Sequence, residues 1–321
     1  MFRLFLILIL FLNITNYSFS KGKNKEDYNL LDNKLTIFIN SEEYDKKTFK
    51  QIEKILNHIQ TVLDPYKSNS FVSKFNKLER NTQMSVPDVF VDSFRMLSDY
   101  HKITKGRFDP TTFSILANTS KASRVKYLLN SNLYDQCISL ASITIKISNV
   151  FSKKYSCTKI SFDAVIEGIV VENVRYFLEK QNIPSFYISF GNTYYSKNYG
   201  SDPPVFSRTI NEVLRDNKIN LNNIASYSFL DNFSRDKIKT FHINANKKDL
   251  VYENNIFVIV ASNSPHNNSI LANTFNLLDI QKMDPNDYLE YEIPILIIYE
   301  DQLGYKTFLS KNFEEHLDPS E

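Results

Sequence analysis

The chain has 321 residues, of which 42% are hydrophobic, which is enough for one large core or two intertwined ones. Its formal net charge is +2, and no basic run is dense enough to form a nucleic-acid-binding surface. We therefore expect no nucleic-acid partner, and the charge gives no reason to expect binding to anionic membranes.

The N-terminal twenty residues have the pattern of a secretory signal. Arg3 precedes the apolar run Leu4 to Leu12, and a polar stretch with small residues follows before Lys21. The run is short for a membrane-spanning helix, and an uncleaved anchor is the alternative. We predict an exported, periplasmic protein that is peripheral to a membrane at most. The predicted organisation is a signal peptide at residues 1–20, a polar linker at 21–33 and one domain at 34–321.

The chain contains two cysteines, Cys137 and Cys157. In an exported protein they can form a disulfide, and the segment between them has the pattern of a hairpin that would bring them together. A free, buried pair is the alternative that the sequence leaves open.

Beyond the linker, apolar runs and amphipathic patterns alternate along the chain. Helices are predicted at 49–63, 85–103, 163–178 and 264–278, and the segment 194–220 reads as loop with one short helix. Strands are predicted at 34–40, 143–147, 159–162, 185–190, 223–233, 239–244, 256–261 and 294–299, with a frayed tail after the last. The hairpin count favours an α+β fold with mostly antiparallel sheets flanked by helices.

The stretch Ser161 to Glu172 is the most informative part of the chain. It leads from a predicted strand into a helix for which Asp163 is a plausible N-cap. Free backbone N–H groups at a helix start favour an anion, most often a phosphate. Gly168 inside this helix costs about 1 kcal/mol relative to alanine, which indicates that something passes close to the backbone. The alternative is that Gly168 only lets another element pack there.

Two further segments carry candidate binding residues. Tyr66 and Asn76 belong to a turn-rich segment after the first helix, and they are potential ligand contacts or parts of a surface connection. The loop from Arg107 to Thr112 follows Gly106, which is expected at a helix C-terminus. This loop combines an aromatic residue with Asp109, which either contacts a ligand or caps a turn.

Taken in order, these motifs resemble those of the FAD:protein FMN transferases, the ApbE-type flavin transferases, from about Thr36 to Tyr299. Three of the six glycines, at 106, 168 and 191, fall on glycine positions of that family. The segments that carry the resemblance are Asp64 to Asn76, Thr104 to Thr111, Ser161 to Glu172, Tyr187 to Asn192, Ser226 to Leu230, His242 to Asn246 and Asn268 to Thr274.

The resemblance implies a T-fold-like flavin transferase architecture and a reaction. The family transfers FMN from FAD to a threonine hydroxyl of an exported or membrane redox protein and releases AMP, with Mg²⁺ on the phosphates. The expected partner is therefore an acceptor protein with a target threonine, such as a subunit of a membrane redox complex. FAD is the expected substrate and Mg²⁺ the expected cofactor.

Carried over position by position, the resemblance also implies roles for individual residues. His242 is the expected catalytic residue, and backbone oxygens of Ala164 and Ala272 would face the cation with the amide oxygen of Asn273. The expected FAD-binding residues are Tyr66, Asn76, Arg107, Phe108, Asp109, Glu167 and Ile243.

The sequence departs from the family pattern where metal ligands are expected. Ser269 stands where the family has a metal-ligating aspartate, and Asn273 stands where it has a threonine. Because negative ligands offset the cost of dehydrating Mg²⁺, such a site should bind metal weakly. Three hypotheses follow: an active transferase with a relaxed metal site, a pseudoenzyme that binds flavin or a partner, and an exported structural protein.

Overall fold

A computed structural model describes most of the chain after the predicted signal peptide. The described residues are 23–31, 33–40, 46–106, 108–116, 134–146, 149–199, 213, 217–219, 221, 224–231, 242–244, 249–251, 255–276 and 293–319. The predicted signal peptide and Arg107 lie outside them.

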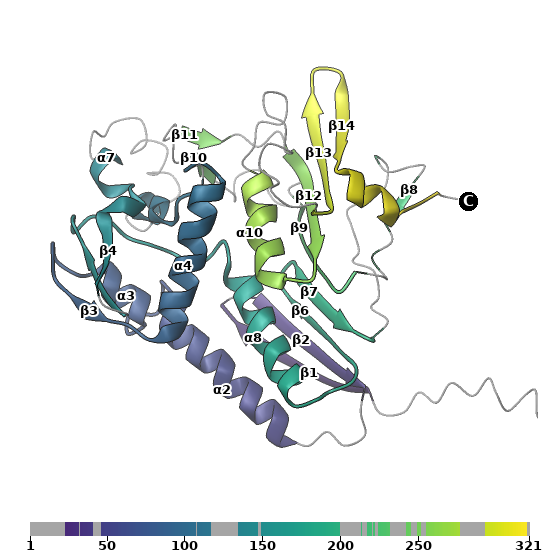
Figure 1. The fold of residues 1–321 in the computed structure, drawn as a ribbon, viewed down its shortest axis with the longest axis horizontal. Helices are drawn as coiled ribbons and strands as arrows, with labels where there is room; N and C mark the ends of the chain where they lie inside the picture. The colour runs from purple at the N-terminus through teal and green to yellow at the C-terminus, as the bar shows by residue number, and fades with distance from the viewer. Residues whose placement is uncertain are drawn as a thin grey trace, which may run out of the picture.

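An eight-stranded sheet forms the centre of the fold (Figure 1). Its strand order is β1-β2-β6-β7-β9-β12-β13-β14, and every neighbouring pair is antiparallel. The predicted α+β class with mostly antiparallel sheets is therefore confirmed. The strands are β1 (Lys23–Leu30), β2 (Asn33–Asn40), β6 (Phe186–Phe190), β7 (Thr193–Lys197), β9 (Ser226–Asp231), β12 (Asn255–Ser262), β13 (Ile295–Asp301) and β14 (Gly304–Leu309).

The other described elements are short strands in smaller sheets, helices and 3-10 turns. The short strands are β3 (Met84–Ser85), β4 (Ile143–Lys146) and β5 (Val150–Lys153) in one sheet, β10 (His242–Asn244) with β11 (Asp249–Val251), and β8 (Asn217–Ile219) with β15 (Leu317–Pro319). The helices are α2 (Lys46–Leu63), α3 (Phe71–Asn76), α4 (Asp88–Ile103), α5 (Phe113–Leu116), α7 (Tyr134–Cys137), α8 (Ile166–Lys180) and α10 (Pro265–Asn276), with 3-10 turns η1 (Pro110–Thr112), η2 (Leu140–Ser142) and η4 (Lys311–His316).

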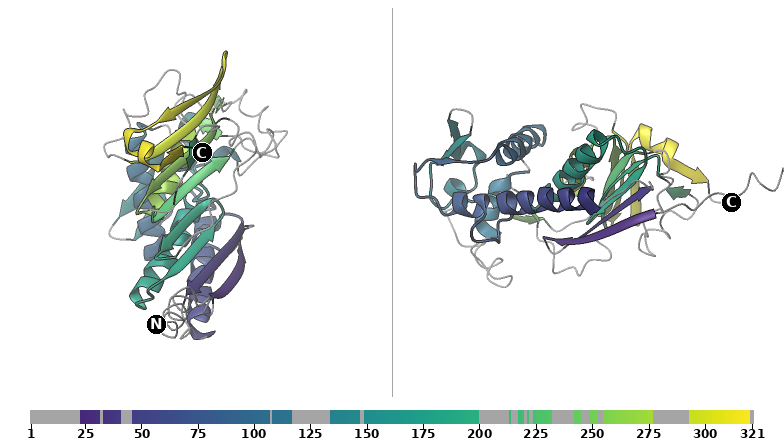
Figure 2. Two further views of the ribbon diagram at one scale, coloured as in Figure 1. Left: turned by 90° about the vertical axis from the view of Figure 1, so that its right-hand side faces the viewer. Right: turned by 90° about the horizontal axis from the view of Figure 1, so that it is seen from below.

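Helices α8 and α10 pack against each other and against the sheet (Figure 1). The long helix α2 packs on α8 and α4, and so connects the sheet to the smaller sheet of β3, β4 and β5 (Figure 2). One continuous apolar core joins these helices to the sheet. A second, smaller apolar cluster contains Phe257 of β12 and Phe313 of η4 together with residues of β9 and β13. Within the described residues, no helix is long and apolar enough to cross a membrane.

Five sequence predictions about local structure are wrong. Residues 23–30 form strand β1 rather than a linker, because this strand pairs with β2 along its whole length and buries Leu30. The chain also forms strand β7 where the sequence predicts a loop, and β14 where it predicts a frayed tail. The predicted strand at 159–162 is irregular, and helix α8 begins after Val165 without a side-chain cap, so Asp163 is not its N-cap.

Gly168 lies where α8 meets α10. A Cβ at Gly168 would lie 2.5 Å from the Cα of His266 and 2.8 Å from the carbonyl oxygen of Pro265. These separations are too short for non-bonded heavy atoms, so glycine is what allows the two helices to approach. The close passage predicted from Gly168 is therefore that of a neighbouring helix.

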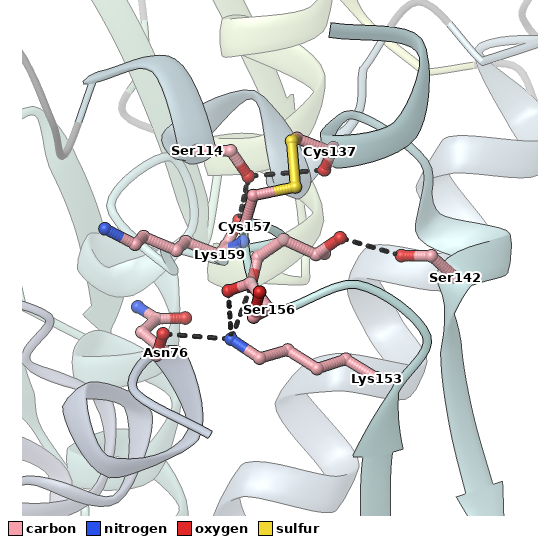
Figure 3. Close-up of a disulfide and its surroundings, with 9 residues drawn as sticks. Asn76, Ser114, Cys137, Ser142, Lys153, Ser156, Cys157 and Lys159 are labelled. Carbon is pink, nitrogen blue, oxygen red and sulfur yellow. Dashed lines mark hydrogen bonds between the residues drawn. A yellow bond between two sulfur atoms is a disulfide. The ribbon is translucent and has the colours of Figure 1, made fainter. Parts of the chain in front are cut away.

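Cys137 and Cys157 form a disulfide that joins α7 to the loop after β5 (Figure 3). Lys153, which is 1% exposed, lies beneath this loop. Its Nζ donates hydrogen bonds to the backbone carbonyls of Asn76, Ser156 and Thr158, at 2.9, 3.0 and 2.9 Å (Figure 3). Burial lowers the pKa of Lys153 to about 8, while the three carbonyl acceptors favour its charged form. The ammonium group thus holds both sides of Cys157 in place.

We expect Lys153→Met to lower the free energy of unfolding by about 2–4 kcal/mol, because three buried carbonyls lose their donor. The measurement is urea unfolding under oxidising conditions. The matched control is Lys154→Met at the exposed neighbouring position, where a change within about 0.5 kcal/mol is expected. Equal losses in the two variants would contradict the role assigned to Lys153.

Gly191 forms the turn between β6 and β7 with φ at +55°. A Cβ there would lie 2.1 Å from Oε1 of Glu167, whose carboxylate sits on the turn. The left-handed backbone favours glycine at this position, and the Glu167 carboxylate would have to leave the turn to admit a Cβ.

We expect Gly191→Ala to lower the free energy of unfolding by about 3 kcal/mol, and by only about 1–2 kcal/mol in a Glu167→Ala background, where the backbone cost alone remains. A double-mutant cycle measured by chemical unfolding tests this. Gly304→Ala is the control, because Gly304 also has positive φ, at +113°, and has no atom within 4 Å of the added Cβ. A cost at Gly191 that is independent of residue 167 would refute the steric explanation.

Candidate functional site

A hollow of about 470 Å³ lies at the amino end of α8. This volume is in the range of small-molecule binding sites. Its wall combines the β1–β2 turn, the last part of α2, the turn after α2 and the first turn of α8. The lining residues are Leu31, Asn33, Gln60, Asp64, Tyr66, Lys67, Asp163, Ile166 and Glu167.

Tyr66 is the exposed aromatic residue of this hollow, with 76% of its surface accessible. Its hydroxyl donates a 3.0 Å hydrogen bond to Oδ2 of Asp163, and its ring meets Phe113 edge-on with the ring centroids 6.0 Å apart. Asp64 fixes the turn, because its Oδ1 accepts hydrogen bonds from the backbone N–H groups of Tyr66 and Lys67 at 2.9 and 3.2 Å. The tyrosine side chain is therefore positioned by Asp163 and Phe113 while most of its surface stays accessible.

Asp163 is accessible to solvent but lies against the wall of the hollow. Desolvation in this recess raises the pKa of its carboxyl, and hydrogen bonds involving Ser161 and Tyr66 partly oppose the rise. Asp163 is thus a hydrogen-bonding group of the hollow rather than the helix cap that the sequence predicts.

Glu167 connects the hollow to the main sheet. Its Oε2 accepts a 3.0 Å hydrogen bond from the backbone N–H of Asn192, and Thr193 Oγ1 lies 3.5 Å away. The carboxylate thereby holds the tip of the β6–β7 hairpin against the first turn of α8. Glu167 lines the hollow, and it also supports the hairpin turn at Gly191.

The hollow carries more acidic than basic groups. Asp64, Asp163 and Glu167 line it, and Lys67 is the one basic residue among the described lining residues. Carboxylates accept hydrogen bonds, so they suit ribose or ribityl hydroxyls and ring N–H groups. They oppose a bare phosphate, although the helix terminus itself favours an anion. The wall therefore suits hydroxyl and N–H donors better than a bare phosphate.

Asn76 supports the site indirectly, through the backbone of Ile160. Its Nδ2 donates to the carbonyl of Ile160, and its Oδ1 accepts from the N–H of Ile160, both at 2.8 Å. Since both polar atoms are used inside the protein and the residue is 8% exposed, Asn76 positions the segment that leads to Asp163. The structure does not place it at the surface of the hollow.

Phe108 and Asp109 are buried, with exposures of 7% and 6%. The Asp109 carboxylate accepts hydrogen bonds from Thr111 through Oδ1 and from the Leu140 N–H through Oδ2, and it caps η1. Nδ1 of His101 lies 2.8 Å from the carbonyl oxygen of Phe108. The turn-capping alternative for Asp109 therefore holds. Phe113, which follows this loop, contacts the Tyr66 ring, whereas Phe108 and Asp109 do not line the hollow.

The structure brings together two of the three predicted metal positions. Nδ2 of Asn273 donates to the carbonyl oxygens of Ala164 and Ser269, both at 2.9 Å. The residues present do not fit Mg²⁺, because a hydrogen-bond donor faces the Ala164 oxygen that would have to bind the ion. Ala272 is 1% exposed, and within the described residues no group of three or more acidic, histidine or cysteine side chains could hold a metal.

The remaining predicted residues are described only in part. His242 and Ile243 belong to β10, where they pair with Val251 and Leu250, and the structure describes their backbone alone. Arg107 lies outside the described residues. Their proposed roles in catalysis and in FAD binding therefore stay predictions.

Sequence reasoning misses several residues of the wall. Leu31 and Asn33 fall in the predicted linker, so the sequence does not indicate their approach to α8. Gln60 lies on α2 and Ile166 lies on α8, and these two helices become neighbours only through tertiary packing. Lys67 follows the Asp64–Pro65 turn, and the Asx-type signal of that turn is the one local clue to its position.

Three comparisons with known proteins agree with this architecture. The sequence profile described as the ApbE family matches residues 31–205, which is more than half of the chain. A curated relative from Buchnera aphidicola subsp. Schizaphis graminum, named FAD:protein FMN transferase, is 26% identical over 153 residues. That alignment covers 44% of this chain and 44% of the relative, so the match spans less than half the length of either protein.

Solved structures show the same fold. The flavin transferase ApbE from Vibrio cholerae superposes with a TM-score of 0.71 at 15% identity, covering 92% of this chain and 99% of that one. The apo form of the flavinyl transferase ApbE from Pseudomonas stutzeri gives a TM-score of 0.73 at 14% identity, covering 92% and 96%. The ApbE protein from Thermotoga maritima gives 0.72 at 12% identity, covering 92% and 99%. Together with the profile match, these findings show that the chain belongs to the ApbE family.

Proposed function

We propose that this protein binds FAD in the hollow at the amino end of α8 and transfers FMN to a threonine hydroxyl of an acceptor protein. Membership of the ApbE family and the name of the curated relative support the reaction class. The observation that carries the location is the hollow itself, in which the largely exposed side chain of Tyr66 lies beside carboxyl groups. Aromatic faces stack on flavin or adenine rings, and carboxylates accept hydrogen bonds from hydroxyls.

In this reaction the threonine oxygen attacks the phosphorus on the FMN side of the FAD diphosphate. The new P–O bond forms as the bond to the AMP phosphate breaks, AMP leaves, and the threonine proton passes to a base. His242, on the short strand β10, is the proposed base. Tyr66 would orient a ring, while Asp163 and Glu167 would hold hydroxyl groups at the mouth of the hollow.

Mg²⁺ is the cation expected from the family resemblance, where it would neutralise charge on the diphosphate. In this chain the Ala164 oxygen accepts a hydrogen bond from Asn273, so the described residues do not form a protein site for the ion. An ion that takes part would have to arrive bound to the nucleotide. The dependence of transfer on Mg²⁺ concentration is therefore a property to measure separately from FAD binding.

A second function is supported by the same observation. Because an amide N–H₂ group rather than a cation site faces the Ala164 oxygen and the hollow is acidic, the described residues provide little neutralisation for a phosphoryl transfer. A protein that binds flavin or a partner without transferring FMN satisfies this arrangement. Incubation of the protein with FAD, Mg²⁺ and a threonine-containing acceptor peptide separates the two functions. FMN-modified peptide in the mass spectrum supports transfer, and bound FAD without modified peptide supports binding alone.

We also propose that the protein acts outside the cytoplasm, on an acceptor that is a subunit of a membrane redox complex. The N-terminal sequence pattern and the Cys137–Cys157 disulfide support export, because disulfides persist in oxidising compartments. We expect the purified mature chain to begin near Lys21 and its cysteines to react with iodoacetamide only after reduction. Intact-mass analysis tests both points, and a retained Met1 with free thiols would contradict export.

We expect Tyr66→Ala to weaken FAD binding about tenfold, because one stacking contact is worth about 1–1.5 kcal/mol. Tyr66→Phe keeps the ring and removes the hydroxyl that binds Asp163, so it should weaken binding less. Fluorescence titration of FAD provides the dissociation constants. Tyr176→Ala on the exposed face of α8 is the control, since Tyr176 is 64% exposed and does not line the hollow. Equal affinities for the 66 and 176 variants would exclude this hollow as the FAD site.

A further inference from the structure

Asn273 bridges two elements that meet behind the hollow. It lies on α10, and its Nδ2 donates to the backbone oxygen of Ala164 in the irregular segment before α8. The same Nδ2 donates to the oxygen of Ser269, one turn earlier on α10. Both distances are 2.9 Å, and Ser269 Oγ also lies 3.4 Å from the Ala164 oxygen.

These two acceptors determine which way the amide faces. Both groups that surround Nδ2 are carbonyl oxygens, which accept hydrogen bonds and donate none. If the amide were turned over, Oδ1 would take the place of Nδ2 between two oxygens at hydrogen-bond distance, which is unfavourable without a cation between them. The NH₂ group therefore provides partial positive charge where two carbonyl dipoles converge.

Neighbouring side chains do not provide an alternative cation site. Asn268 is fully buried, and it bonds through Oδ1 to Ser262 and through Nδ2 to Ser226. Within the described residues, no group of three or more acidic, histidine or cysteine side chains could hold a metal. A divalent ion at Ala164 would have to displace the amide of Asn273, and it would find no group of three acidic, histidine or cysteine ligands among the described residues.

We propose that the side-chain amide of Asn273 is a built-in substitute for a divalent cation, which ties α10 to Ala164 so that this locus stays ordered and binds no metal. The cation expected from the family resemblance is thereby replaced by two hydrogen bonds within the protein. The part of this inference that concerns FAD rests on the proposed function. The part that concerns metal binding by the protein without nucleotide is independent of it.

The test compares thermal unfolding with EDTA and with about 10 mM MgCl₂, both without nucleotide. We expect the Tm of the wild-type protein to be the same in the two conditions. Asn273→Asp places a carboxylate beside two carbonyl oxygens, so its Tm should be lowered in EDTA and raised again by Mg²⁺ by at least about 3 °C. Asn273→Ala should lose several degrees in both conditions, because the bridge is absent and no ligand is added.

Asn173→Asp is the matched control. Asn173 makes the same bond on α8, from Nδ2 to the carbonyl oxygen of Ile169 at 2.8 Å, without a second segment to bridge. Its Asp variant should show no rescue by Mg²⁺. A wild-type Tm that rises with Mg²⁺, or equal rescue of the 173 and 273 variants, would overturn the proposal.

A second arm uses FAD titration of the wild-type protein with and without EDTA. Equal dissociation constants support a locus that works without metal. Loss of FAD binding in EDTA overturns the proposal when the wild-type Tm without nucleotide also rises with Mg²⁺, and with an unchanged Tm it assigns the ion to the nucleotide and supports the metal-free locus. If FAD binds in neither condition, the proposed function fails while the thermal experiment still decides the role of Asn273. A failure of the flavin assignment is thereby distinguishable from a failure of the amide assignment.

Discussion

The position of the irregular segment from Thr158 to Val165 determines the geometry of the whole site. This segment belongs to no helix or strand, so its backbone groups need partners elsewhere. Asn76 supplies both partners of Ile160, as a neighbouring strand would do, and the buried ammonium of Lys153 holds Thr158. The disulfide at Cys157 closes the other side of the same loop. Because these bonds place the chain just before Asp163, they set where the hollow opens.

Close packing of two helices completes this arrangement. Gly168 lets α10 approach α8 more closely than any side chain would allow, and the same approach brings Asn273 within hydrogen-bond distance of Ala164. The glycine and the amide therefore work together, one by removing volume and the other by supplying a donor. A larger residue at position 168 would move α10 outward and separate the amide from its acceptor.

The fold is largely predictable because its core strands and helices have strong periodic patterns, as in β12 and α8. Strand β1 escapes prediction because it is an edge strand with Lys25, Glu26 and Asp27 in its exposed part, so its sequence has the polarity of a linker. The site is less predictable. The sequence presents Asp109 equally as a ligand contact or as a turn cap, and only the bonds to Thr111 and Leu140 distinguish the two. Likewise, an asparagine offers both a donor and an acceptor, and its neighbours decide which one is used.

The acidic hollow and the bridging amide lead to the same conclusion about the chemistry. Transfer of a phosphoryl group requires neutralisation of the charge that spreads over the phosphate oxygens. Around the hollow, the described residues offer Lys67 as a cation, against the carboxyl groups of Asp64, Asp163 and Glu167. Charge neutralisation would therefore have to come from a nucleotide-bound ion or from residues outside the described ones, such as Arg107. Binding of a flavin nucleotide needs none of this, because ring stacking and hydroxyl recognition are independent of the diphosphate charge. Under the proposed function, the requirements for binding are thus separate from those for transfer, and measuring the two apart is what distinguishes an enzyme from a binding protein on the same fold.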